Sequence, residues 1–243
     1  MMRDYNAETD LRVDFIRKVL TDAGAKGVVY GNSGGKDCAL VGILCKLACE
    51  NTLGLLMPCG TKQNYGSDIT DALALAEKFN IESRTVDLKD SALSIESAIK
   101  GVTELSDAAA SNIAPRLRMT TLYAVGASEG RLVAGTGNAS ERYMGYFTKW
   151  GDGACDFNPI ADLTVSEIYE FLEHLGAPES IRKKPPSAGL FEGQTDESEM
   201  GVTYSSIDGY ILTGKCIPED LEIITRYHKS SGHKRAQPLL YGE

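Results

Sequence analysis

A glycine-rich segment is the part of the sequence best suited to bind phosphate. Gly31-Asn32-Ser33-Gly34-Gly35-Lys36-Asp37-Cys38 follows a short apolar run and precedes a helical pattern. Glycines at such a turn let backbone N–H groups close on an oxyanion, and the N-terminus of the following helix adds positive potential. The segment is not a Walker A loop, because that motif requires glycine at position 30, where this chain has tyrosine.

Asp37 adds a second kind of chemistry at the end of this loop. A carboxylate beside bound phosphates is unfavourable unless a cation lies between them, so Asp37 indicates Mg²⁺. The alternative is that the glycines form only a tight turn. The order of strand, loop, carboxylate and helix favours a nucleotide-phosphate site with a metal.

The elements around the loop predict the fold that must position it. Strands are predicted at 27–30, a short apolar run, at 53–57, and at 83–88 and 131–134. Amphipathic or apolar helical patterns separate them: one ends near Gly24, one runs from the loop to Cys49, one covers 67–79, and others flank Gly101. This alternation predicts an α/β fold with a Rossmann-like parallel sheet and helices on both faces. Binding sites in such sheets lie at the carboxyl ends of the strands.

The alternation of predicted strands and helices ends after residue 136. Residues 144–162 read as loops, and Thr164 with Glu167 forms a capping box that predicts a helix to Leu175, closed by Gly176. Residues 182–197 read as a long polar loop, of a length that suggests an ordering ligand or partner. Two helices, at 206–213 and 219–229, are predicted to follow.

The overall composition limits the function classes. The net charge of −9 over 243 residues argues against a broad nucleic-acid-binding face. No window approaches the roughly 18 apolar residues of a membrane span, and the polar start is unlike a secretory signal. The six cysteines include no Cys-x-x-Cys pair, so they read as reduced thiols of a cytoplasmic protein rather than as zinc ligands.

The loop resembles a known motif. Residues 33–38 are similar to the Ser-Gly-Gly-x-Asp-Ser pyrophosphate loop of the ATP pyrophosphatases, which cleave ATP between its α- and β-phosphates. These enzymes include NAD synthetases, GMP synthetases, asparagine synthetases and tRNA-thiolating enzymes. The loop alone does not choose among them.

Later segments narrow the resemblance to NAD synthetases. Residues 135–141 look like their Gly-Thr-x-x-x-x-Glu stretch, and residues 145–153 are similar to their Gly-x-x-Thr-Lys-(aromatic)-Gly-Asp-Gly loop. Residues 184–190 and 194–197 match their Pro-(Ser/Thr)-Ala loop, and residues 233–235 match their C-terminal basic triplet. The motifs run in the family's order over about residues 10–236. The resemblance implies the adenine nucleotide alpha-hydrolase-like fold.

The resemblance also implies an activity. Residues 1–243 would form a single NAD synthetase domain with no glutamine amidase domain, since only about 30 residues precede the loop and no amidase nucleophile–base pair is visible. The implied reaction amidates deamido-NAD to NAD with ATP and ammonia, through an acyl-adenylate, releasing AMP and pyrophosphate. Relatives imply a homodimer with substrate sites at the interface.

Site residues carry over by matched position. The ATP-binding set is Gly31, Asn32, Ser33, Gly34, Gly35, Lys36, Asp37, Cys38, Thr136 and Ser187. The Mg²⁺ ligands are Asp37 and Glu141. The deamido-NAD contacts are Arg118, Lys149, Asp156, His233 and Lys234, and the catalytic set is Asp37, Glu141, Lys149 and Asp156.

Two positions depart from the family pattern. Cys38 stands where the family usually has serine, and Val165 stands where many members have a lysine that contacts ATP. A helix N-terminus lowers the pKa of a thiol, so part of Cys38 is expected to be thiolate. The alternative is that Cys38 points into the core as a small apolar residue.

Three other functions compete with the ligase. Another adenylating ATP pyrophosphatase, such as a tRNA thiolase, would need paired cysteines and a basic surface, and the sequence has neither. A catalytically silent nucleotide-binding module would be favoured by loss of Asp37 or Glu141, and both are present. A pure interaction protein leaves the phosphate loop unexplained.

Overall fold

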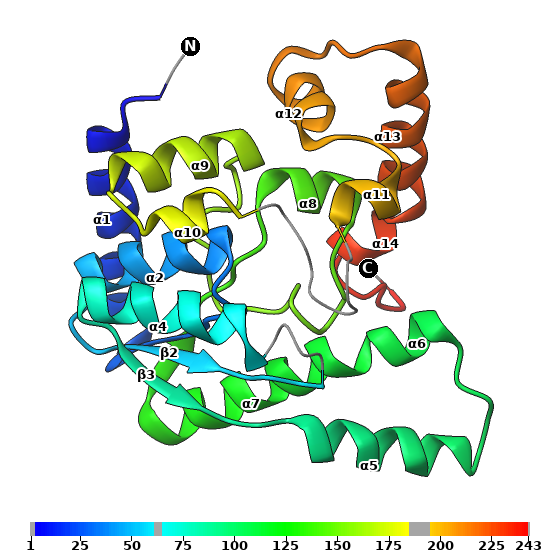
Figure 1. Cartoon of the computed structure of the whole chain (residues 1–243), viewed down its shortest axis with the longest axis horizontal. Helices are drawn as coiled ribbons and strands as arrows, with labels where there is room; N and C mark the ends of the chain where they lie inside the picture. The colour runs from blue at the N-terminus through cyan, green and yellow to red at the C-terminus, as the bar shows by residue number, and fades with distance from the viewer. Residues whose placement is uncertain (1–2, 61–64, 185–194, 243) are drawn as a thin grey trace.

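Four parallel strands form the centre of the protein. A computed structural model describes residues 3–60, 65–184 and 195–242 (Figure 1). The strands are β1 (Gly27–Gly31), β2 (Thr52–Leu56), β3 (Glu82–Thr85) and β4 (Arg131–Val133), and their order in the sheet is β3-β2-β1-β4. All three pairings are parallel, with Val29 opposite Leu53 on one side and Val133 on the other. The predicted α/β fold with a parallel sheet is therefore confirmed.

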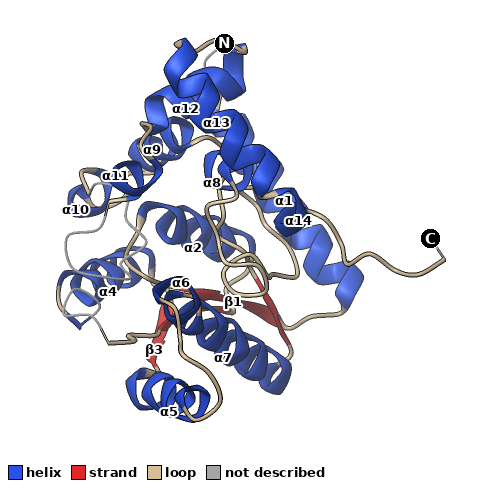
Figure 2. Cartoon of the chain, turned by 90° about the vertical axis from the view of Figure 1, so that its right-hand side faces the viewer, coloured by secondary structure: helices blue, strands red, loops and turns tan. Residues whose placement is uncertain are grey.

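Helices cover both faces of the sheet. The helices of the first part of the chain are α1 (Tyr5–Ala23), α2 (Lys36–Ala48), α4 (Ser67–Phe79), α5 (Lys89–Lys100), α6 (Asp107–Ser111) and α7 (Ile113–Glu129). Helices α2 and α4 lie on one face, and α7, with α5 beyond it, lies on the other (Figures 1 and 2). Helix α1 packs on the outer side of α2, which explains why α2 is apolar around its whole circumference.

A second group of helices follows β4 in the chain. It comprises α8 (Ala139–Met144), α9 (Val165–His174), α10 (Glu179–Arg182), α11 (Asp196–Met200), α12 (Tyr204–Thr213), α13 (Pro218–Ser230) and α14 (Gly232–Arg235). Met144, Met200, Ile207 and Ile224 form a core here that is separate from the two cores of the sheet. We call this core and its helices α8, α11, α12 and α13 the helical lobe.

Most predicted elements are found within a few residues of their predicted ends. The third strand is the exception, because it ends at Thr85 rather than at residue 88. Its side chains are largely exposed, as expected at a sheet edge, and Leu88 already serves as the N-cap of α5. The Thr164–Glu167 capping box is confirmed, although Leu175 rather than Gly176 is the C-cap of α9. The short helices α6, α8, α10, α11 and α14 were not predicted.

The strand order fixes where a ligand can bind. The chain winds from β1 to β2 and β3 on one side and then returns to place β4 on the other side of β1. The loops that leave β1 and β4 therefore part in opposite directions at the carboxyl edge, and such a switch point creates a crevice. No helix in the described parts of the chain is long and apolar enough to cross a membrane.

Tyr30 places a hydroxyl group in the hydrophobic core. Tyr30 in β1 is fully buried, and within the described residues its hydroxyl has no hydrogen-bond partner. The ring lies against two glycines: a Cβ added to Gly42 would lie 2.3 Å from the Tyr30 hydroxyl oxygen, and one added to Gly54 would lie 3.1 Å from it. Glycine at both positions thus makes room for the Tyr30 hydroxyl, which the described part of the chain leaves without a partner.

We expect Tyr30→Phe to raise the free energy of unfolding by about 1 kcal/mol, because it removes a desolvated hydroxyl and keeps the ring. Urea denaturation of the wild type and the variant measures the difference. Tyr5→Phe is the matched control, since the Tyr5 hydroxyl donates to Glu170 at 2.7 Å, and it should not stabilise the protein. A fall in stability for Tyr30→Phe would contradict the assignment.

Candidate active site

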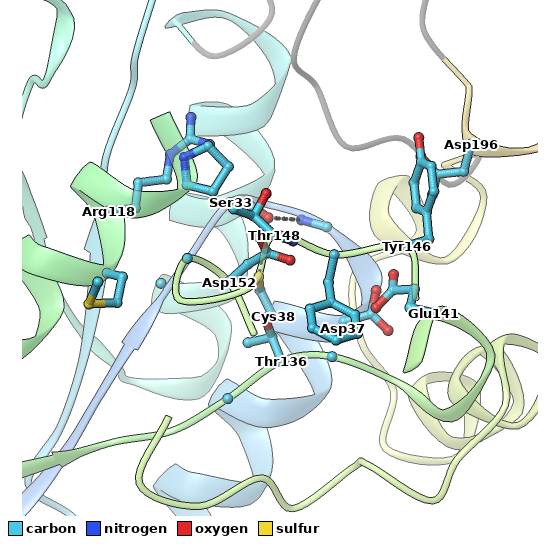
Figure 3. Close-up of a pocket in the computed structure, with 18 of the residues that line it drawn as sticks. Ser33, Asp37, Cys38, Arg118, Thr136, Glu141, Tyr146, Thr148, Asp152 and Asp196 are labelled. Atoms are coloured by element: carbon cyan, nitrogen blue, oxygen red, sulfur yellow. Dashed lines mark hydrogen bonds between the residues drawn. The ribbon is translucent and has the colours of Figure 1, made fainter. Parts of the chain in front are cut away.

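A cavity of about 650 Å³ opens at the carboxyl edge of the sheet. Its walls come from the loops after β1 and β4, from α7 and α8, from residues 144–154 and from α13. Figure 3 shows Asp37 beside Glu141 on one side of this cavity and Arg118 on the opposite side. The cavity therefore lies between the sheet and the helical lobe.

The phosphate loop has a fixed backbone. Gly34 has φ of +72°, and a Cβ there would lie 2.3 Å from the carbonyl oxygen of Asp68, so only glycine fits. The buried side chain of Asn32 accepts from Gly34 N–H at 3.3 Å and donates to the Ala72 carbonyl at 3.2 Å. Gly35 begins α2 without a side-chain cap. The first N–H groups of α2 are thus available to an anion in the cavity.

Two carboxylates and one ammonium meet at the start of α2. The Lys36 Nζ lies 2.7 Å from Asp37 Oδ2 and 4.0 Å from Glu141 Oε1. The Lys36 side chain is 6% exposed. Burial opposes its charge, yet the nearby carboxylates of Asp37 and Glu141 raise the Lys36 pKa above its usual value. Burial, followed by the charge of Asp37, raises the pKa of Glu141 well above its ordinary value.

Asn138 holds these carboxylates in place. Its side-chain amide donates to Asp37 Oδ1 at 3.0 Å, while its backbone N–H donates to Glu141 Oε2 at 3.1 Å. Its side-chain oxygen accepts from the Glu141 N–H at 2.9 Å, which completes a capping box at the start of α8. Asn138 was missed in the sequence, although Asn-x-x-Glu before a helix is a readable capping pattern.

The donor set fits a hard divalent cation. Asp37 and Glu141 present only oxygen atoms, and both are partly buried near the Lys36 ammonium. Burial and the charge of Asp37 disfavour the ionised form of Glu141, so a further cation would stabilise both carboxylates. In the described ranges no cluster of three or more acidic, histidine or cysteine side chains could hold a metal by itself. Mg²⁺ is commonly bound by one or two carboxylates together with substrate phosphates, which is the arrangement this pair permits.

Cys38 is buried and protonated rather than partly ionised. Its Sγ lies 3.2 Å from Ser33 Oγ, and the residue is 8% exposed at the floor of the cavity and within the main core. Burial raises the pKa of its thiol, and the hydrogen bonds from Ser33 offset only part of that effect. The expectation of a thiolate is therefore wrong, because desolvation outweighs the potential of the helix N-terminus.

The other predicted ligand-contacting residues divide into two groups. Thr136, Arg118 and Lys234 line the cavity. Arg118 donates to the Met57 carbonyl at 3.1 Å, and burial lowers its pKa. The Lys234 ammonium is bonded to the carbonyls of Gly145 and Phe147, at 2.9 and 2.8 Å.

Three described residues of the predicted substrate-contacting set lie outside the cavity lining: Lys149, Asp156 and His233. Lys149 donates to the His233 carbonyl at 2.6 Å and sits over the Trp150 ring. Asp156 accepts from Val133 N–H at 2.7 Å and from the Tyr123 hydroxyl at 3.3 Å. Ser187 lies outside the described residues.

Two further features had no signal in the local sequence. Lys184, at the cavity wall, is bonded to Asp68 and Asp71 of α4, at 2.8 and 2.9 Å. These partners are more than 110 residues away in the chain. Val165 is buried in the core of the helical lobe. The position where many members of the family carry a lysine is thus used for packing.

Comparison with known proteins gives consistent matches. The NAD synthase family model matches residues 8–238. The NH(3)-dependent NAD(+) synthetase of Carboxydothermus hydrogenoformans is 44% identical over 241 residues, 98% of this chain and 98% of that protein. The structure of NMN synthetase from Francisella tularensis aligns with a TM-score of 0.93 at 37% identity, covering 99% of this chain and all of that one. The NH3-dependent NAD synthetase from Campylobacter jejuni aligns with a TM-score of 0.79 at 32% identity, covering 98% and 99%.

The buried thiol of Cys38 predicts a pH profile for alkylation. Because its pKa lies above the ordinary value of 9.0, the reactive thiolate is scarce at pH 7 and increases only as the pH passes about 9. We expect iodoacetamide to label Cys38 slowly at pH 7 and faster at pH 9.5, as measured by peptide mass spectrometry. Cys216, which is partly exposed, is the internal reference. Rapid labelling of Cys38 at pH 7 would contradict this prediction.

Proposed function

The chain belongs to the NAD synthase family, and we propose that it is an ammonia-dependent NAD synthetase. It joins ammonia to the nicotinate carboxylate of deamido-NAD and converts ATP to AMP and pyrophosphate. The observation that carries this proposal is the Asp37–Lys36–Glu141 cluster, which lines the cavity where Glu141 of α8 lies beside the uncapped start of α2. Carboxylates that can hold a cation, an ammonium group and free helix N–H groups are what a departing pyrophosphate needs beside it.

The first step forms an acyl-adenylate. A nicotinate carboxylate oxygen attacks the α-phosphorus of ATP, and the bond from that phosphorus to the bridging oxygen breaks. The N–H groups of the phosphate loop and of the first turn of α2 receive the pyrophosphate. Asp37 and Glu141 would hold Mg²⁺, which neutralises charge on the leaving group when it is bound. Thr136 lines the same cavity and is proposed, with Ser187, to contact ATP.

The second step forms the amide. The ammonia nitrogen attacks the acyl carbon, AMP leaves with the bridging oxygen, and one proton is released from the nitrogen. We propose that the ammonia is free or delivered by a separate protein. The Carboxydothermus hydrogenoformans and Campylobacter jejuni relatives are named NH3-dependent, and we propose that residues 1–243 act as one domain without an amidase.

The proposed deamido-NAD contacts are Arg118, Lys149, Asp156, His233 and Lys234. Arg118 and Lys234 line the cavity, whereas Lys149 and His233 lie together outside the lining. This separation supports a substrate site that a second copy of the chain completes, and so a homodimer. The proposed location is the cytoplasm, where thiols such as the six free cysteines stay reduced.

A second candidate substrate is nicotinate mononucleotide. It is favoured by the higher TM-score to the structure named NMN synthetase, 0.93 against 0.79 for the Campylobacter jejuni NAD synthetase. The carboxylate that reacts is the same, so the phosphate loop and the metal ligands would act identically. Comparing kcat/KM for the two substrates under the same conditions separates the candidates, since the larger value identifies the substrate.

With Mg²⁺, ATP and ammonium, we expect the protein to convert deamido-NAD to NAD and to release one AMP for each NAD formed. Cleavage between the α- and β-phosphates requires this stoichiometry. Chromatography of the nucleotides measures both products in one sample, with ammonium omitted as the control. ADP and phosphate in place of AMP and pyrophosphate would refute the proposed reaction.

Asp37→Asn and Glu141→Gln should each lower kcat by about 100-fold or more, because the departing pyrophosphate loses a charge-neutralising cation. Circular dichroism and thermal unfolding should show a folded protein in both cases. Asp22→Asn, which removes an exposed carboxylate paired with Lys18, is the matched control with unchanged kcat. Near-normal turnover of both site variants at saturating Mg²⁺ would remove these residues from the metal site.

A further inference from the structure

Lys36 occupies the position at which a cation is needed. Its ammonium lies 2.7 Å from Asp37 Oδ2 and 4.0 Å from Glu141 Oε1. Asn138 occupies the other oxygens, Asp37 Oδ1 and Glu141 Oε2, as a hydrogen-bond donor. The oxygens that face the ammonium are therefore the ones that Asn138 leaves open to a cation.

The surroundings hold the ammonium at this place. The Lys36 side chain is 6% exposed, and its Nζ lies 5.7 Å from the centre of the Tyr204 ring. The Tyr204 hydroxyl is engaged with Asp196 at 3.0 Å. A buried ammonium needs anionic partners, and the nearest ones are the two carboxylates.

A metal ion and the Lys36 ammonium cannot both bind tightly to these two carboxylate oxygens. Two positive charges within about 4 Å repel each other strongly where water is largely excluded. Two carboxylates alone also give Mg²⁺ too few ligands, so nucleotide phosphates must supply others. The same phosphates are anions beside the Lys36 ammonium, because the loop that would bind them contains this residue.

We propose that Lys36 is a positioning residue that acts as an internal counter-ion and makes metal binding depend on the nucleotide. Without nucleotide, its ammonium offsets part of the negative charge of Asp37 and Glu141 and weakens the binding of divalent cations. When nucleotide binds, the phosphates accept the ammonium and release the carboxylate oxygens to the metal. The inference rests on the proposed function, since it takes Asp37 and Glu141 as the metal ligands.

Mn²⁺ binding to the nucleotide-free protein tests this directly, because electron paramagnetic resonance measures the free Mn²⁺ without turnover. The wild type should bind Mn²⁺ weakly. Lys36→Met, which keeps the length of the side chain, should lower the Kd at least about tenfold, since one unit charge near the carboxylates is removed. Lys36→Arg should keep the weak binding.

Two controls assign the gain to these carboxylates. Lys18→Met removes one exposed positive charge, paired with Asp22, and should leave the Kd unchanged. Lys36→Met combined with Asp37→Asn should abolish the tighter binding. A merely structural role of Lys36 would loosen rather than tighten Mn²⁺ binding, so an unchanged or raised Kd for Lys36→Met overturns the inference.

A structure of the wild type with Mn²⁺ and α,β-methylene-ATP gives a second test that needs no variant. Lys36 Nζ should then lie within hydrogen-bond distance of a phosphate oxygen and no longer contact Asp37 Oδ2. An ammonium that stays on Asp37 overturns the inference even if Lys36→Met fails to fold. If the wild type forms NAD but the Mn²⁺ titration or the structure gives the opposite of the expected result, the inference fails and the proposed function stands. If the wild type forms no NAD, the proposed function fails, and the Mn²⁺ titration still shows whether Lys36 weakens metal binding.

Discussion

The electrostatic conflict between Asp37 and Glu141 is the constraint on which the site depends. Two carboxylates facing one another in a partly buried place are unfavourable without positive charge, and burial raises the pKa of Glu141 accordingly. Asn138 holds the two carboxylates close together, because it donates hydrogen bonds to both side chains. It is also the N-cap residue of α8. Asn138 thus links the start of α8 to the start of α2 through the same two carboxylates that require a cation nearby. A cation that is bound by these carboxylates would also stabilise the negative charge of a departing pyrophosphate.

The sheet supplies the rigid frame for this cluster. Strands β1 and β4 are neighbours, so the loops that carry Asp37 and Glu141 leave the same edge although about 100 residues separate them. Helix α2 is enclosed by β1, α1 and α9, which leaves little freedom for its first turn. The loop before α2 is also restrained by α4, because the backbone of Gly34 lies against Asp68 at the start of that helix.

The sequence predicted those features that depend on neighbours in the chain. The strands, the phosphate loop, the Thr164 capping box and the candidate carboxylates all follow from local pattern or from matched motifs. Features set by distant contacts could not be read in this way. Three such features are the pairing of Lys184 with Asp68 and Asp71, the contact of Lys149 with the His233 carbonyl, and the packing of Val165. Each joins segments that lie far apart in the chain. The thiolate expected at Cys38 failed for a related reason, since the pattern revealed the helix N-terminus but not the burial that outweighs it.

The separation of the hydrophobic cores has a consequence for local opening. The helical lobe has its own buried cluster, and the cavity lies between that cluster and the sheet. A unit with its own core can open as a cooperative block while the rest stays folded, and its amide hydrogens then exchange with solvent. A ligand that touches Asp37 on the sheet side and Tyr227 on the lobe side contacts both parts. The contacts of the ligand with one of the two parts must break before the lobe can open, so bound ligand opposes separate opening of the lobe.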